Sequence, residues 1–260
     1  MCLLIMLVQT HPEFPLVVAG NRDEWLERPA VAMAVLREAS PRVLGGRDEL
    51  AGGTWLAVND AGVVAGLTNR PATKDPAKRS RGDLPIALAS HLSAAAAVEA
   101  FIAKTRPSEY NPAWLLVGDR EAAFAVDMTG DDAPAIQPLA PGVHILENRP
   151  PRAPSPKVDH VRQLLGGVEG LTEEPLVRRL QTVLSDHHVP EGPTATPPEG
   201  SAIEVPPEVK AACVHTERYG TRWSGIVTVP ARSDGVPTIR YADGSPCHGG
   251  FQKADAWWQE

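Results

Sequence analysis

The sequence predicts an α+β protein in which sheets and helices form separate layers. Two β-prone hairpin segments open the chain, at residues 2–20 and 52–69, and another β-prone run spans 219–229. Three segments between them repeat apolar side chains at helical spacing: residues 85–104, 158–165 and 176–184. Because strands and helices follow one another in blocks, this order favours an α+β architecture over an alternating βαβ chain.

Composition limits the classes of function. The 260-residue chain has a formal net charge of −7 and no basic block, so nucleic acid is not an expected partner. The apolar run after Met1 is short and has no basic segment before it, so we expect neither a membrane span nor a signal peptide. Three scattered cysteines do not describe a disulfide framework, and we expect a reducing, cytoplasmic location.

The chain has 26 prolines, and two clusters of them lie near residues 150–156 and 190–207. Both clusters interrupt regular structure and predict long surface loops. The chain has no internal repeat, and the simplest organisation is one domain over residues 1–260 that carries these loops. The sequence leaves the oligomeric state open.

The second residue is the strongest functional signal. Methionine aminopeptidase removes an initiator methionine when the next residue is as small as cysteine, so a trimmed chain would carry a thiol and a free α-amine on Cys2. A nucleophile and a base placed together on one residue suit acyl transfer. The alternative is that Cys2 is only a buried strand residue, and the sequence does not settle whether Met1 is removed.

The first two β-prone runs predict an antiparallel hairpin that turns near Pro12. Paired residue numbers then sum to about 24, so Arg22 is expected opposite Cys2 and on the same face. A guanidinium within about 4–6 Å of a thiol favours the thiolate. Asp23 or Glu24 could hold the α-ammonium group. A register slip of one residue would reverse the faces, and the alternative reading is an exposed charge cluster.

Two apolar strands end in the same Asn-Arg-Pro phrase, at residues 69–71 and 148–150. An asparagine at a strand end offers an N–H donor toward a cleft, which suits an oxyanion hole. Asn69 and Asn148 are therefore candidate oxyanion donors. The alternative is that both only form turns, because asparagine is also common where strands end.

Other candidate sites carry weaker signals. His187-His188 and Cys247-His248 contain metal-ligating side chains. Adjacent histidines seldom converge on one ion, and Cys247 has no partner pair at ligand spacing, so no metal site is expected. The glycine pairs at 45–46 and 52–53 lack the context of a phosphate loop and predict turns that need positive φ.

These features together resemble the NRDE family, the transport-and-Golgi-organisation-2 proteins. The resemblance spans residues 1 to about 230 and rests on these motifs, in order: Met1-Cys2, Asn21-Arg22-Asp23-Glu24, Gly52-Gly53-Thr54-Trp55, Leu67-Thr68-Asn69, Tyr110-Asn111, Leu115-Leu116-Val117-Gly118-Asp119, Ser185-Asp186-His187 and Tyr219-Gly220-Thr221-Arg222. That family in turn resembles the cysteine N-terminal-nucleophile (Ntn) hydrolases of the choloylglycine hydrolase and penicillin V acylase type. The resemblance implies a four-layer αββα sandwich with Cys2 at the end of a central strand.

The resemblance also implies roles for three later residues. Asn69 looks like the oxyanion asparagine of those acylases, Asn148 like their second active-site asparagine, and Arg222 like their late arginine.

One departure concerns the early charged pair. The acylases separate their arginine and aspartate by two residues, whereas Arg22 and Asp23 are adjacent. Neighbours in a strand face opposite sides, so we expect Arg22 at the sulfur and Asp23 at the amine.

Two functions remain open at this level. The first is an amidase-type cysteine hydrolase or acyltransferase that cleaves an amide or thioester bond of a small acyl substrate through an acyl-Cys2 intermediate, without a cofactor. The second, suggested by the resemblance, is a non-catalytic carrier of haem, acyl-coenzyme A or lipid on the same fold. A carrier would need an apolar cleft and, for haem, a soft ligand such as Cys2 or His11. The sequence does not specify the substrate or its leaving group.

Overall fold

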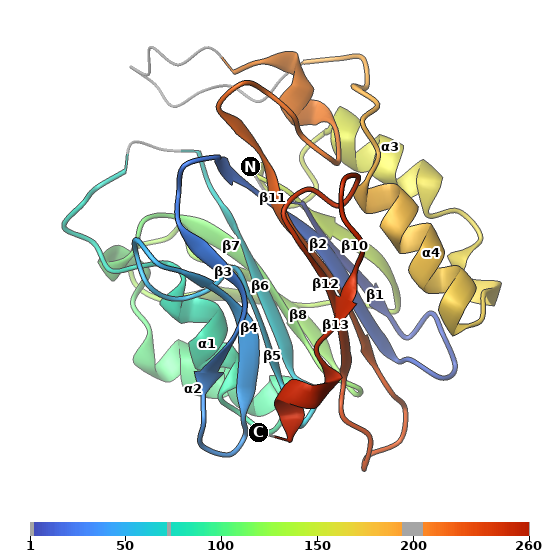
Figure 1. Ribbon diagram of the computed structural model, residues 1–260. Helices are drawn as coiled ribbons and strands as arrows, with labels where there is room; N and C mark the ends of the chain where they lie inside the picture. The colour runs from blue at the N-terminus through green and yellow to red at the C-terminus, as the bar shows by residue number, and fades with distance from the viewer. Residues whose placement is uncertain (1–2, 72–73, 194–204, 260) are drawn as a thin grey trace.

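Two antiparallel sheets stack face to face, and each carries a pair of helices on its outer side (Figure 1). The computed structural model describes residues 3–71, 74–193 and 205–259. One apolar core lies between the two sheets. A second core lies between the first sheet and its helices, and a third lies between the second sheet and its helices. The architecture is the four-layer αββα sandwich, and the expected fold class is confirmed.

Among the described residues, the first sheet has the strand order β10-β1-β2-β11-β12-β13. Its strands are β1 (Leu3–Val8), β2 (Leu16–Trp25), β10 (Gly142–Leu146), β11 (Tyr219–Val229), β12 (Thr238–Asp243) and β13 (Gln252–Lys253). The second sheet runs in sequence order from β3 to β9. Its strands are β3 (Ala30–Arg37), β4 (Val43–Asp48), β5 (Leu56–Asn59), β6 (Val64–Asn69), β7 (Ala113–Gly118), β8 (Ala123–Asp127) and β9 (Ala135–Pro138).

The helices form the two outer layers. Helices α1 (Asp83–Ala89) and α2 (Ala94–Lys104) cover the second sheet, and α3 (Pro156–Leu164) and α4 (Glu173–Leu184) cover the first. Single 3₁₀ turns occur at Pro107–Glu109, Val168–Gly170, Pro207–Lys210 and Asp255–Trp258. No helix in the described ranges has both the length and the apolar composition needed to cross a bilayer.

Strand β1 is buried on both faces, which explains its unbroken apolar sequence. Its even-numbered residues, Leu4, Met6 and Val8, point into the core between the sheets. The odd-numbered residues pack against the layer of α3 and α4 instead. Because side chains alternate along a strand, residue parity reports which layer each position of β1 faces.

The register of the first hairpin agrees with the prediction. Leu3 pairs with Asn21 and Val8 with Leu16, so paired numbers sum to 24 along the described part of the hairpin. The predicted pairing of Cys2 with Arg22 itself lies outside the described residues.

Other expected elements differ in detail. The hairpin at 52–69 is β5 and β6, joined at Asn59–Gly62, where Gly62 has φ of +94°. The expected continuous helical segment at 85–104 is two helices, because the Ser93 hydroxyl accepts the Ala96 N–H and starts α2 anew. Of the two expected proline loops, residues 150–155 contain no helix or strand, and most of the second lies outside the described residues.

The two glycine pairs serve different purposes. Gly52 and Gly53 have φ of +67° and +75°, as their turn prediction requires. The turn prediction for Gly45 and Gly46 is wrong, because both lie within β4. There a Cβ on Gly46 would come 2.0 Å from the Trp55 ring, so the glycine permits close packing of an aromatic side chain.

Candidate functional site

A cavity of about 510 Å³ opens beside the ends of β2, β4 and β6. Its wall includes Arg22 and Asp23 from β2 and Asn69 from β6. These are three of the site residues expected from sequence. Most of the rest of the wall comes from residues 48–55 and 74–82, and it also includes Glu24, Arg28, Leu67 and Asn111.

The two Asn-Arg-Pro phrases lie side by side, although β6 and β10 belong to different sheets. The Thr68 hydroxyl donates to the Glu147 carbonyl over 2.9 Å, and Asn148 Nδ2 donates to the Asn69 carbonyl over 2.5 Å. The side-chain amide of Asn69 has no hydrogen-bond partner within the described part of the chain. Asn69 borders the cavity.

Arg22 extends from β2 toward the second sheet and is buried. Its Nη2 donates to Asp48 Oδ2 of β4 over 2.8 Å, and its guanidinium carbon lies 4.6 Å from the centre of a Trp55 ring. The side chain therefore joins the ends of the two sheets where they border the cavity. A buried guanidinium in this position favours a negative charge beside it.

Asp48 is shared between two arginines. Arg28 Nε and Nη2 donate to its two oxygens over 2.8 and 3.1 Å, beside the bond from Arg22. Burial alone would raise the pKa of Asp48. The hydrogen bonds from Arg28 and the Ala51 N–H, with the two positive charges, outweigh burial and hold this pKa below its usual 3.8.

Arg222 does not border the cavity. Its Nη1 donates to the Arg28 carbonyl over 2.5 Å and to the Trp25 carbonyl over 3.3 Å. The Arg222 guanidinium thus holds the backbone of the turn after β2. Arg28 lies in this turn, and its side chain binds Asp48. This geometry fits a positioning role and places no Arg222 atom at the cavity wall.

Asp23 faces the opposite side of β2 from Arg22, as strand alternation requires. The Thr221 hydroxyl donates to Asp23 Oδ1 over 2.6 Å, and the Thr221 oxygen accepts the Val214 N–H over 2.8 Å. Burial raises the pKa of Asp23 above 3.8, against the opposing effects of the Lys157 charge, the Thr221 hydroxyl and the Arg22 charge.

Lys157 is a site residue that the sequence reading missed. It lies on α3, is only 2% exposed, and its Nζ has no hydrogen-bond partner among the described residues. Its charge acts on Asp23. A lysine beside Pro156 in the first turn of a helix carries no sequence signal for burial, because lysines are usually exposed.

Cys2 lies outside the described residues. The even-numbered residues of β1 that the structure describes face the core between the sheets. Arg22 reaches Asp48 from the same face of β2.

Comparison with known proteins assigns the family. A family model described as Transport and Golgi organisation 2 matches residues 1–238. The chain belongs to the Transport and Golgi organisation 2 family. The Transport and Golgi organization protein 2 homolog of Bos taurus is 31% identical in an alignment over 253 residues, with a coverage of 89% for each chain.

Solved structures relate this family member to the Ntn hydrolases at the level of the fold. The N-acylethanolamine-hydrolyzing acid amidase ortholog of Caenorhabditis elegans has a TM-score of 0.55 and 12% identity, covering 91% of this chain and 98% of that one. A conjugated bile acid hydrolase from Clostridium perfringens, in its C2A mutant form, has a TM-score of 0.46 and 11% identity, covering 98% and 97%. The expected relation to this fold is confirmed.

In this Transport and Golgi organisation 2 protein, the fold gathers most of the expected site residues. Arg22, Asp23 and Asn69 border one cavity, and Asn148 holds the Asn69 backbone from the other sheet. Arg222 is connected to this group indirectly, through its hydrogen bond to the Arg28 carbonyl. The sequence reading missed Asp48 and Lys157, since neither follows a strand-end motif.

We expect Asp48→Asn to destabilise the protein by about 2 kcal/mol at pH 7, because hydrogen bonds from two guanidinium groups to a carboxylate are lost. A carboxyl whose folded-state pKa is depressed contributes stability above its unfolded pKa of about 3.8 and loses it as pH falls through the folded value. The difference between wild type and variant should therefore be constant above about pH 5 and shrink below 3.8. Urea unfolding across this pH range measures it.

Asp132→Asn is the matched control, because Asp132 is exposed and has no ion-pair partner among the described residues. It should change stability by less than about 0.5 kcal/mol at each pH. A loss for Asp48→Asn that is equal at pH 3 and pH 7 would contradict the ion-pair account.

Proposed function

We propose that this protein is an Ntn-type cysteine hydrolase or acyltransferase that cleaves an amide or thioester bond through an acyl-Cys2 intermediate. The observation that carries the proposal is the Asn69 amide, which has no hydrogen-bond partner among the described residues and borders the same cavity as Arg22 and Asp23. The register of β1 on β2 supports a nucleophile at the residue that precedes Leu3, opposite Arg22. The reaction expected first is the hydrolysis of an amide, at a carbon–nitrogen bond other than a peptide bond.

The chemistry begins with removal of Met1. The Cys2 thiolate, favoured by the Arg22 guanidinium, attacks the substrate carbonyl carbon and forms the carbon–sulfur bond. The carbonyl oxygen becomes an oxyanion that accepts a hydrogen bond from Asn69 Nδ2. The Cys2 α-amine takes the thiol proton when the thiolate forms and returns it, through water, to the leaving nitrogen or sulfur as its bond to carbon breaks. Water, or another acceptor, then releases the acyl group from Cys2.

The remaining site residues are assigned supporting roles. Asp23 orients the α-ammonium group from the helix-facing side of β2, and the positive charge of that group favours the ionised form of the buried carboxyl. Asn148 holds the carbonyl of Asn69 and so fixes the direction of the oxyanion donor. Arg222 acts further back, through Arg28 and Asp48, on the position of Arg22.

The charge of the cavity wall indicates the kind of leaving group. Lys74 and Lys78 belong to the wall and have no ion-pair partner among the described residues. They lie on the same rim as Arg79 and Arg81. Cationic groups around a cavity concentrate anionic ligands, so we infer that the substrate carries negative charge outside its acyl chain.

The carrier alternative receives less support. A cavity for haem or lipid is expected to be mainly apolar, with few polar groups. The described wall of this cavity contains Arg22, Arg28, Asp48 and several lysine and arginine side chains of residues 74–81. His11 is buried, and its ring is bonded to the Leu171 carbonyl and to the backbone of its own turn, which fits the alternative of a turn histidine.

We expect Asn69→Ala to lower kcat by about 10²–10³-fold with little change in KM, because an oxyanion donor acts mainly in the transition state. Asn148→Ala should lower kcat in the same direction by a smaller factor. Steady-state kinetics on amide and thioester substrates measure both. Gln137→Ala, which removes an exposed amide on β9, is the control and should leave kcat unchanged. Equal activity of Asn69→Ala and wild type on every substrate that wild type turns over would contradict the assignment.

We expect the double variant Lys74→Glu/Lys78→Glu to raise KM about tenfold for a substrate with an anionic leaving group, equivalent to about 1.4 kcal/mol. KM for a neutral analogue should change little, because it lacks the charge that the lysines attract. The matched control is Lys104→Glu/Lys253→Glu, which makes the same charge change at exposed positions outside the cavity wall. An equal effect on both substrates would show that the lysines do not recognise the leaving group.

A further inference from the structure

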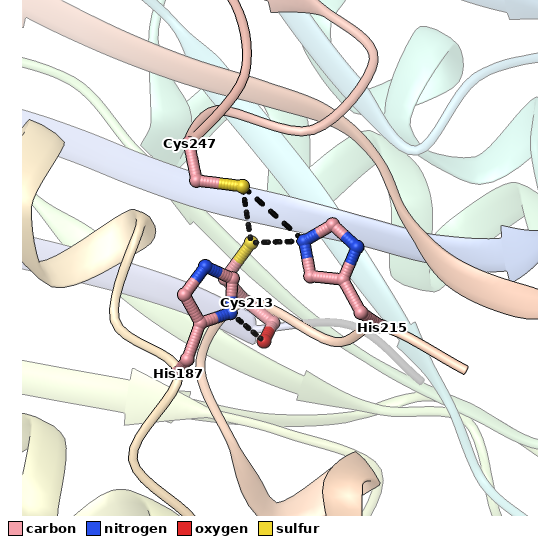
Figure 2. A group of neighbouring side chains, drawn as sticks. All are labelled: His187, Cys213, His215 and Cys247. Atoms are coloured by element: carbon pink, nitrogen blue, oxygen red, sulfur yellow. Dashed lines mark hydrogen bonds between the residues drawn. The ribbon is translucent and has the colours of Figure 1, made fainter.

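Four metal-ligating side chains converge at a place that is separate from the wall of the cavity. They are His187, Cys213, His215 and Cys247, shown in Figure 2. His187 follows α4, Cys213 and His215 precede β11, and Cys247 lies between β12 and β13. Neither His187 nor Cys247 lies at a metal-ligand spacing in the sequence. Only the fold brings the three segments together.

The ligand atoms have spacings suited to a tetrahedral ion. Cys213 Sγ lies 3.6 Å from His215 Nε2 and 3.9 Å from Cys247 Sγ, and His215 Nε2 lies 3.2 Å from Cys247 Sγ. One ligand atom from each of the four residues lies within 4.8 Å of the others. Bonds of about 2.3 Å to sulfur and 2.0–2.1 Å to nitrogen in a tetrahedron place ligand atoms about 3.3–3.8 Å apart.

The ring of His187 is already oriented as a metal ligand requires. Its Nδ1 lies 3.2 Å from the Cys213 carbonyl, as a donor to that oxygen (Figure 2). This bond fixes the tautomer that leaves Nε2 as the lone-pair nitrogen. A backbone carbonyl that holds the second nitrogen of a histidine is the usual outer partner of such ligands.

The two sulfurs also argue for a cation. Cys213 and Cys247 are free thiols, and their separation of 3.9 Å is far beyond a disulfide bond of about 2.05 Å. A separation of 3.9 Å is instead close to the spacing of about 3.8 Å between two sulfur ligands of one tetrahedral zinc ion.

We propose that His187, Cys213, His215 and Cys247 bind one structural Zn²⁺ ion. Two thiolates and two imidazoles make the closed four-ligand set that zinc prefers in structural sites. With four protein ligands the ion has no open position, so its role is to cross-link the end of α4, the entry to β11 and the β12–β13 loop.

The segment that contains Cys213 and His215 is linked to Asp23 by two hydrogen bonds. The backbone N–H of Val214, between the two ligands Cys213 and His215, donates to Thr221, which donates to Asp23. The zinc ion would therefore stiffen the residues that hold this carboxyl group. The site stands without the proposed hydrolase activity, because none of the four ligands belongs to the cavity wall.

The test is metal content of the full-length protein, purified with reduced thiols and loaded with Zn²⁺ alone. Inductively coupled plasma mass spectrometry should find about one zinc per chain in wild type. Cys247→Ser and His187→Ala should each weaken zinc binding at least about 100-fold in a chelator competition, since losing even an outer partner of a ligand costs about 10–100-fold. Cys247 is the preferred site of change because it is only half-buried in a loop.

The neighbouring histidines provide matched controls. His188→Ala and His248→Ala alter the next residue in each segment without removing a ligand and should keep the wild-type stoichiometry. Co²⁺ in place of Zn²⁺ should give thiolate charge-transfer absorption in wild type that Cys247→Ser loses. Wild type that binds no zinc with both thiols reduced would overturn the proposal, as would a Cys213–Cys247 disulfide in protein purified without reductant. Zinc loading of wild type alone decides the question if a variant fails to fold.

Discussion

The pairing of β1 with β2 is the constraint on which the site depends. With Leu3 opposite Asn21, even-numbered residues of β1 face the second sheet and odd-numbered residues face α3 and α4. A slip of one residue would exchange the two faces of β1. The same alternation separates Arg22 from Asp23, which explains how adjacent charged residues act on different sides of one strand end.

The second constraint is the closure of the two sheets at the cavity. Asn148 on the first sheet bonds to Asn69 on the second, and Arg22 on the first bonds to Asp48 on the second. Each link gives a hydrogen-bond partner to a polar group that would be costly to bury without one. The bond from Asn148 thereby holds the backbone of Asn69 at the cavity wall, and the proposed oxyanion donor depends on such preorganisation.

Much of the fold follows from local sequence patterns. The hairpin register follows from Pro12 and two apolar runs, and α4 follows from helical spacing. Strands β3, β4, β9, β12 and β13 were not predicted. Strand β4 contains Gly45-Gly46, which read as a turn but permits packing against Trp55 and Leu56. Asp48, Lys157 and the His187–Cys247 cluster are products of tertiary contacts between distant segments, so no spacing in the sequence could indicate them.

The proposed hydrolase requires that Met1 is removed and that Cys2 is the nucleophile that becomes acylated. Intact mass spectrometry with peptide mapping, after brief reaction with a slowly hydrolysed acyl substrate, tests it most directly. We predict a chain lighter by one methionine that carries one acyl group on Cys2, and no acyl group on Cys2→Ala. Retention of Met1, or an acyl group located on Cys213 or Cys247 with equal yield in Cys2→Ala, would contradict it.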